Sequence, residues 1–341
     1  MAPKTTISQV ADMAGVSIAT VSRFINNSAS VKNKTGERIM EAITALNYPL
    51  PSEFVTPTLT ARDRKKIITV NIPSISNPFY NAVLKGIQAA ALRHEYHMIV
   101  NVQHLDMTTL PIFLNLVDTI DSCGAITLNA MNTELFELLY NKIPFVQCCE
   151  FTENQDRVSY TSIDDVQAAK KVTEYLLSTG RKKIGFLSGP MRYKYARHRL
   201  NGFTQTLEAS GIPIHSEWII KLPELDFDMA VSSVQQLMLQ PDHPNAIFAV
   251  SDVLAAAVIR ACRIAGLTVP EDVVVSGFDN IDISQAISPA ITTINQPKYQ
   301  LGYMACELLI EKLNNPQAQA KQITLNTDLI IRESTQNSIY L

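Results

Sequence analysis

Several motifs that mark enzymes are missing from this 341-residue sequence. It contains no GxGxxG, GxxxxGK[ST] or GxSxG, so the usual phosphate-binding loops and the nucleophile turn of hydrolases are absent. The stretch "HEYH" at 94–97 spaces its histidines three apart, whereas an HExxH zinc site needs them four apart on one helical face. We therefore expect neither catalysis nor a bound metal or cofactor.

Long apolar runs are also missing. No run reaches the roughly 18 residues that a membrane helix needs, and the N-terminus, "MAPKTTISQV", lacks an apolar signal-peptide core. We therefore expect no membrane partner and a cytoplasmic location. The five cysteines are odd in number and have no CxxC spacing, which predicts small buried thiols rather than disulfides.

The composition fits a globular chain of two or three domains, with 46% hydrophobic and 18% charged residues. The net charge is only −3, but it is unevenly spread. Residues 1–66 hold nine Lys and Arg against five Asp and Glu, so the remainder of the chain is acidic. A small basic head on an acidic body is typical of a head that meets phosphate, although many solvated surfaces look similar.

The stretch "TISQVADMAGVSIATVSRFIN" at 6–26 predicts two short helices joined by a tight turn. Thr6 to Gln9 has the form of a capping box, Gly15 suits a left-handed helix end, and Ser17 can cap the second helix. With a third pattern at 39–46, these helices predict a three-helix core. Its apolar residues are Val10, Ala11, Ala14, Val21, Phe24, Ile25, Ile39, Ile43 and Leu46.

The outward side chains of the second helix distinguish this pattern from an ordinary helical hairpin. Periodicity leaves Ile18, Ala19, Ser22 and Arg23 facing away from the core. Small side chains can touch a thymine methyl group in the major groove, and Arg can reach guanine. The pattern therefore favours a helix that reads DNA.

The spine VAxxAGVSxxTVSRxxN, from Val10 to Asn26, resembles the DNA-binding head of the lactose-repressor (LacI/GalR) family. The resemblance implies double-stranded operator DNA as a partner. It also implies that the bases are read by Ile18, Ala19 and Arg23. The implied phosphate contacts and helix starts are Thr6, Ser17, Thr20, Ser22 and Asn26.

The segment that follows departs from this family. Its members usually carry Ala-Arg-x-Leu in a hinge helix that opens the minor groove, but here "LNYPLPSEFVTPTLTARDRKKI" has no such motif at the expected distance. Pro49, Pro51 and Pro57 oppose a helix, at about 3 kcal/mol for each interior proline. We expect an extended tether that tolerates variable half-site spacing. The basic run at 62–66 is either a solvated linker end or an added phosphate contact.

After residue 66 the pattern alternates between apolar strands and amphipathic helices, which predicts parallel sheets wrapped by helices in two subdomains. The candidate strands are 67–72, 97–102, 125–128, 145–149, 183–188, 246–251 and 273–278. The candidate helices are 165–178, 197–209, 252–265 and 299–313. The fold class is thus an all-α helix-turn-helix head on an α/β body.

The fingerprints "KIGFLSGP", "RLNGF", "SDVLAAAV", "GLTVPEDVVVSGFDN" and "PAITTINQP" resemble the periplasmic-binding-protein-like body of the same family. We therefore divide the chain into a head at 1–50, a linker at 51–66 and a body at 67–341. The first subdomain is expected at 67–163 and 297–322, and the second at 164–296 and 323–335. The resemblance implies an effector cleft lined or flanked by Phe79, Tyr80, Asp164, Tyr195, Arg199, Phe227, Asp252, Asp279 and Gln296.

These residue types suit a polyhydroxylated ligand. Ligands of such folds bind beyond the carboxyl ends of the strands, where carboxylates and an Arg can pair with neighbouring hydroxyls while aromatic rings cover the apolar side. A single Asp after a strand can equally be a helix cap. Within the family, the chain resembles the cytidine-responsive branch through "PEDVVVSGFDNIDISQ", "LIIRES" and the abnormal hinge. Another nucleoside, a pentose or a purine base is the alternative.

The resemblance implies a ligand-responsive repressor that acts as a homodimer, because one small head offers few base contacts. It also implies operators shared with the cyclic-AMP receptor protein. A helix at 299–313 can contribute to the core or to a dimer interface. A solute-binding protein without DNA activity and a DNA-architectural protein without a ligand are more distant alternatives.

Overall fold

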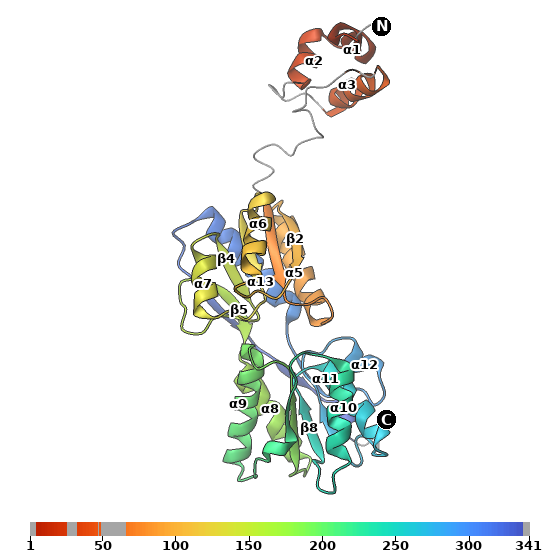
Figure 1. The fold of residues 1–341 in the computed structure, drawn as a ribbon, viewed down its shortest axis with the longest axis vertical. Helices are drawn as coiled ribbons and strands as arrows, with labels where there is room; N and C mark the ends of the chain where they lie inside the picture. The colour runs from red at the N-terminus through yellow and green to blue at the C-terminus, as the bar shows by residue number, and fades with distance from the viewer. Residues whose placement is uncertain (1–4, 26–32, 47, 49–65, 337–341) are drawn as a thin grey trace. The chain divides into compact units, whose positions relative to one another are not determined.

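The computed structural model describes residues 5–25, 33–46, 48 and 66–336 (Figure 1). The chain divides into two compact units, residues 1–60 and 61–341. Asn26 lies outside the described residues, and so does the predicted linker except for Lys66. The expectations about the linker therefore stay predictions.

The head contains the three predicted helices, α1 (Ile7–Ala14), α2 (Ile18–Ile25) and α3 (Asn33–Ala45). The Gln9 side chain accepts the Thr6 backbone N–H at 2.8 Å, and Ser17 Oγ accepts the Thr20 backbone N–H at 3.2 Å. Gly15 ends α1 with φ of 63°, a conformation that glycine adopts without strain. The buried core contains six of the predicted residues and one that was not predicted, Ala42. The predicted Phe24, Ile25 and Leu46 pack against it partly buried. The buried residues are Val10, Ala11, Ala14, Val21, Ile39, Ala42 and Ile43.

The first subdomain is built on a six-stranded parallel sheet. Its strands, in spatial order, are β11 (Gln322–Leu325), β5 (Tyr160–Ile163), β4 (Phe145–Cys148), β3 (Gly124–Thr127), β1 (Ile67–Ile72) and β2 (His97–Val102). All but the first residue of β1 are buried, as expected for a parallel strand covered on both faces.

Helices cover both faces of this sheet. α5 (Phe79–Arg93) and α13 (Lys298–Asn314) pack together and share one apolar cluster with alternate residues of the strands. A second cluster joins α6 (Leu110–Thr119) and α7 (Thr133–Tyr140) to the remaining strand residues. Leu301, Ala305, Leu308 and Leu309 of α13 are buried within this subunit, so that face of the helix belongs to the core.

The second subdomain holds a four-stranded parallel sheet in the order β7 (Ile219–Lys221), β6 (Ile184–Ser188), β8 (Ala246–Ala249) and β9 (Val274–Ser276). Two helix pairs flank it on opposite sides in Figure 1. One pair is α8 (Asp165–Ser178) with α9 (Lys194–Ala209), and the other is α10 (Phe227–Met238) with α11 (Asp252–Ile264). Short helices are α12 (Ile283–Ala286), η1 (Ser216–Trp218) and η2 (Glu333–Thr335).

The chain crosses between the subdomains three times: after β5, before α13 and after β11. β10 (Thr293–Asn295) pairs antiparallel with β12 (Asp328–Ile330) beside two of these crossings. Because β11 pairs with β5, residues 323–325 continue the first sheet, and the boundary expected after residue 322 falls inside a strand. All five cysteines carry free thiols. Among the described helices, none has the length and apolar character to span a membrane.

Candidate DNA-reading helix and effector cleft

The outer surface of the head gathers most of the residues expected to meet DNA. Ser17, Ala19 and Arg23 are exposed at the start and along the outer face of α2, and the Ile18 side chain is 50% exposed. An exposed Ile is costly in water unless it meets an apolar surface, such as a thymine methyl group. Thr20 and Ser22 are half-buried on the same helix, and Thr6 is exposed at the start of α1.

A cleft in the body opens where the carboxyl ends of both sheets meet, and we call it the effector cleft. The first subdomain contributes residues that follow β1, β3 and β4 and the last residue of β5. The second contributes the start of α8 and residues that follow β6, β7, β8, β9 and β10. The lining residues are Asn77, Phe79, Tyr80, Leu128, Cys149, Glu150, Ile163, Asp165, Tyr195, Arg199, Leu225, Val250, Ser251, Asp279 and Gln296.

Arg199 is the most constrained charge in the effector cleft. Its guanidinium donates to Asp165 Oδ1 at 2.9 Å and to the Val250 carbonyl at 2.6 Å, and it lies 3.7 Å from Asp279 Oδ1. The central carbon of the guanidinium lies 3.4 Å from the centre of the Phe278 ring and 5.0 Å from the centre of the Tyr195 ring. These contacts hold the planar fork in one orientation, so its remaining donors meet a ligand at little entropic cost.

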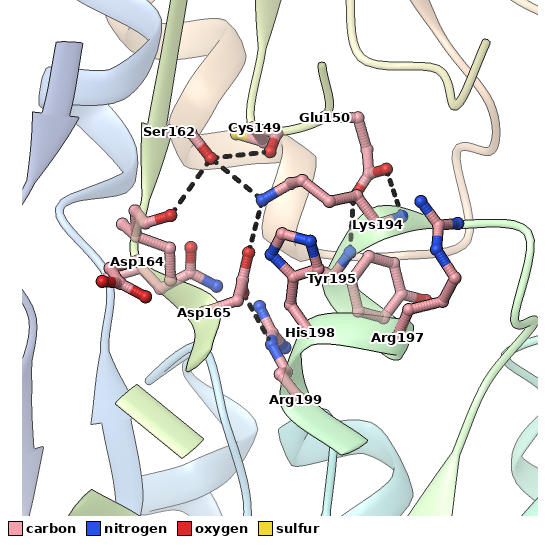
Figure 2. Close-up of polar contacts among 12 residues, drawn as sticks. Cys149, Glu150, Ser162, Asp164, Asp165, Lys194, Tyr195, Arg197, His198 and Arg199 are labelled. Atoms are coloured by element: carbon pink, nitrogen blue, oxygen red, sulfur yellow. Dashed lines mark hydrogen bonds and ion pairs between the residues drawn. The ribbon is translucent and has the colours of Figure 1, made fainter. Parts of the chain in front are cut away.

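A second buried cation, Lys194, ties the two subdomains together (Figure 2). Its ammonium donates to Asp165 Oδ2 at 2.6 Å and to Ser162 Oγ at 3.2 Å, and Ser162 in turn donates to the Cys149 carbonyl. Ser162 belongs to β5 of the first subdomain, whereas Lys194 begins α9 of the second. Asp165 thus joins both buried cations.

Glu150 caps helix α9 from the opposite subdomain. Its carboxylate accepts the Lys194 backbone N–H at 2.7 Å and the Tyr195 backbone N–H at 3.0 Å, as Figure 2 shows. A carboxylate at a helix N-terminus satisfies unpaired N–H groups and meets the positive end of the helix dipole. This contact explains why α9 begins at Lys194, three residues before the predicted helix at 197–209.

A more exposed pair of contacts repeats this connection. Glu153, also in the first subdomain, accepts from Arg197 Nη2 at 2.8 Å and lies 2.9 Å from His198 Nε2. Their side chains are about one-quarter to two-fifths exposed, so each pair contributes little stability by itself. The first two turns of α9 are therefore fastened to the loop after β4 by one buried carboxylate and one exposed carboxylate.

Burial and charge act differently on the three cleft carboxyls. Burial raises the pKa of Asp165, but Lys194 and Arg199 outweigh it, so its pKa lies below the usual value. Burial raises the pKa of Asp279 to about 6 despite Arg199, Lys298 and Gln296. Burial also raises the pKa of Glu150, against Lys194 and two backbone N–H groups. The cleft is thus close to neutral overall and suits a neutral ligand with many hydroxyls.

One polar atom in the effector cleft has no partner. The Tyr195 hydroxyl is buried and makes no hydrogen bond within the described residues. Burial also raises its pKa, so the phenol stays protonated at neutral pH and can donate. An unpaired buried hydroxyl costs roughly 1–3 kcal/mol, and a ligand hydroxyl or ring nitrogen beside it would remove this cost.

Six of the nine residues expected at the effector cleft line it: Phe79, Tyr80, Tyr195, Arg199, Asp279 and Gln296. The structure does not bring the other three to its wall. Asp164 is exposed and caps α8 by accepting the Gln167 N–H at 3.0 Å. Asp252 is buried behind the cleft, where it bonds to Thr293 and Ile281. Phe227 begins α10 half-buried, and nearby Leu225 lines the cleft instead.

Sequence reasoning missed Asp165, Glu150 and Lys194. Asp165 stands next to the predicted Asp164, and helix geometry alone decides which of the two turns inward. Glu150 follows the predicted strand 145–149, so its place at a strand's carboxyl end was the available signal. Lys194 carried no such signal, because its partners come from β5 and the start of α8.

Comparisons with known proteins match both the head and the body of the chain. Residues 6–50 match the family model "Bacterial regulatory proteins, lacI family", and residues 173–335 match "Periplasmic binding protein-like domain". The repressor CytR of Escherichia coli is 31% identical over 332 residues, covering 97% of this chain and 96% of that protein. The repressor PurR of Photobacterium profundum is 30% identical over 339 residues, covering 97% and 99%.

A solved structure resembles the body. The LacI family regulator of Enterococcus faecium, with bound ribose, has a TM-score of 0.70 and 26% identity, covering 79% of this chain and 98% of that one. The head is a helix-turn-helix, the body has two subdomains, and the relatives match over nearly their full length. These three findings indicate the same family. This chain belongs to the lacI family of bacterial regulatory proteins.

Proposed function

We propose that the protein is a transcriptional repressor whose affinity for operator DNA changes when a nucleoside, cytidine, binds in the effector cleft. Two repressors, CytR and PurR, match nearly the whole chain at 30% identity or more. The observation that carries the ligand site is the buried carboxylate of Asp165, which pairs with Lys194 behind the cleft and with Arg199 in its wall, in a cleft shared by both subdomains. A ligand held there contacts both subdomains and can bias how they close.

The preference for a nucleoside rests on the cleft having two kinds of wall. Arg199, Asp279 and Gln296 form a polar wall that suits ribose hydroxyls, and Gln296 Nε2 already donates to Asp279 Oδ1 at 2.6 Å. Phe79, Tyr80 and Tyr195 supply aromatic surface for a base. A free pentose, another nucleoside or a purine base is the alternative, and the ribose in the Enterococcus faecium regulator supports the pentose.

Thermal unfolding of the full chain with cytidine, uridine, adenosine, ribose and hypoxanthine tests this choice. At about 100 times its Kd, a true effector stabilises the folded state by roughly 2.7 kcal/mol and raises the midpoint. A shift with cytidine supports the proposal, and a shift with ribose or hypoxanthine alone moves the effector to an alternative. Arg199→Lys keeps the charge but loses the fork, so it should abolish the shift. No shift with any of the five compounds would contradict the nucleoside site.

We also propose that two copies form the DNA-binding unit. β2 is an edge strand of its sheet, and Val100 and Val102 expose the same face of it. Met107 and Ile112 expose further apolar surface between β2 and the first turn of α6. A second copy of this surface would cover these side chains and bring two heads to one pseudo-palindrome. Operators shared with the cyclic-AMP receptor protein stay an expectation of the family resemblance.

A further inference from the structure

A second hollow lies at the far end of the first subdomain from the effector cleft. It is formed where β4 and β5 begin and where α13 ends, and its cavity volume is about 380 Å³. We call it the basic groove, after its lining residues Lys142, Arg157 and Lys312, which lie beside Tyr140 and Ser159. Because the strands are parallel, this edge is also where the chain enters β1 from Lys66.

Two of the three cations are held in place by their surroundings. Arg157 lies over the Tyr140 ring at 4.6 Å, pairs with Glu137 and donates to Gln155 at 3.0 Å. The Lys312 ammonium donates to the carbonyls of Pro316 at 2.7 Å and Ala318 at 3.3 Å. Fixed cations bind an anion at a lower entropic cost than freely rotating ones.

The basic groove carries an excess of positive charge. Its lining contains three cations and no carboxylate. Glu137 pairs with Arg157 and neutralises the charge of that cation only. Within the described residues, no acid pairs with Lys142 or with Lys312. Glu137 and Asp156 together raise the pKa of Arg157, but Asp156 is exposed and lies outside the lining. The remaining charge of about two matches a phosphate, which carries up to two negative charges at neutral pH.

The neutral groups of the basic groove suit the rest of a phosphate ester. Ser159 Oγ accepts the Lys321 N–H at 2.9 Å, so its own proton can go to a phosphate oxygen. Tyr140 is 41% exposed and offers ring surface to an organic group. We propose that the basic groove binds a phosphate group, with Lys142 and Lys312 as its main cations. The phosphate belongs either to a small phosphate ester or to the DNA backbone.

Calorimetry of the full chain with pyrophosphate, in a low-salt chloride buffer, tests the proposal. The double variant Lys142→Ala/Lys312→Ala should weaken binding by about tenfold or more. Lys182→Ala/Lys221→Ala removes two exposed lysines of the second subdomain and is the matched control, expected to bind as the wild type does. Failure of the wild type to bind pyrophosphate, or equal weakening in both variants, would overturn the proposal.

A second arm identifies the source of the phosphate. The affinity for duplex DNA is measured over a range of salt concentrations for the same two variants. If the basic groove holds a DNA phosphate, the Lys142/Lys312 variant lowers the slope of log affinity against log salt by about 0.9 per phosphate, compared with the control. An unchanged slope together with lost pyrophosphate binding assigns the groove to a small phosphate ester. Neither result depends on the ligand of the effector cleft.

Discussion

Asp252 is a buried carboxyl whose role is structural rather than ligand-binding. Burial, followed by the nearby Asp279, raises its pKa to about 8. Its oxygens lie 2.6 Å from Thr293 Oγ1 and 2.8 Å from the Ile281 backbone nitrogen, so it holds the loop after β9 against β10. Since its pKa is about 8, this carboxyl is mostly protonated at neutral pH.

Asp252→Asn should flatten part of the pH dependence of stability. An unfolded Asp has a pKa of about 3.9, so the folded protein binds more protons between about pH 4 and pH 8. The contribution of Asp252 to the free energy of unfolding is therefore fully present below about pH 4. It is lost as the pH rises through 8, by at most about 1.4 kcal/mol per pH unit. Asn mimics the neutral acid and removes this loss.

Urea unfolding of both proteins at about pH 5, 7 and 9 measures this effect. The contributions of Glu150 and Asp279, whose pKa values are also raised, are present in both proteins and largely cancel in the difference. The free-energy difference should move in favour of the Asn variant as the pH rises. If the free energies of unfolding of the two proteins change in parallel with pH, Asp252 is ionised in the folded state.

At the scale of one element, helix α9 depends on Glu150. Glu150→Gln leaves one acceptor oxygen for two buried N–H groups and removes the charge at the helix N-terminus. We expect the free energy of unfolding to fall by about 1–3 kcal/mol. The affinity for the ligand of the effector cleft should fall as well, because the contact between the subdomains is weakened.

Glu153→Gln is the matched control for this experiment. It removes the same charge from the same loop, but its contacts to Arg197 and His198 are exposed, so the loss should stay below about 1 kcal/mol. Urea unfolding and ligand titration of both variants provide the two measurements. Equal losses for the two variants would refute the buried cap.

Helices α5 and α13 approach so closely that only glycine fits between them. A methyl group on Gly302 would lie 2.0 Å from the Val83 carbonyl oxygen, and one on Gly86 would lie 2.0 Å from the Tyr299 carbonyl oxygen. Gly302→Ala should therefore destabilise the body by about 1–3 kcal/mol or more through overpacking.

Gly180→Ala is the comparison for Gly302→Ala. There the methyl group meets nothing within 4 Å, and only the positive φ of 82° opposes the change. Thermal unfolding of both variants should show the larger loss for Gly302→Ala. A larger loss for Gly180→Ala would mean that the helices separate at little cost.

Local patterns in the sequence predicted most of the elements, and tertiary contacts decided the rest. Apolar stretches placed β1 and β2 at their observed bounds, a capping box placed the start of α1, and the amphipathic pattern placed α8. β11 and β12 escaped prediction because short, partly exposed strands carry little apolar signal. The sequence predicted Asp164 rather than Asp165 as the cleft residue, because an N-cap Asp and the Asp that follows it cannot be distinguished by residue type.

At the scale of the whole molecule, the proposed dimer predicts that a charge on the exposed face of β2 weakens the contact between two copies. Val102→Lys places a charge on the exposed face of edge strand β2 and should shift a dimer toward monomers in sedimentation velocity. Ile264→Lys, at a comparable exposure on α11, should leave the distribution unchanged. A wild-type monomer would contradict the proposed dimer, and a dimer that tolerates Val102→Lys would place the interface elsewhere.

The central claim is that a ligand in the effector cleft changes how the head binds DNA. The most direct measurement is fluorescence anisotropy of the full chain on a duplex selected from a random pool, with and without the compound that raises the unfolding midpoint. We predict that the Kd for DNA changes by at least about fivefold in the wild type, a typical allosteric coupling. Arg199→Lys should bind the duplex with no response, and Arg23→Ala should lose affinity by about 1–3 kcal/mol. An unchanged wild-type Kd at a saturating concentration of that compound would contradict the account.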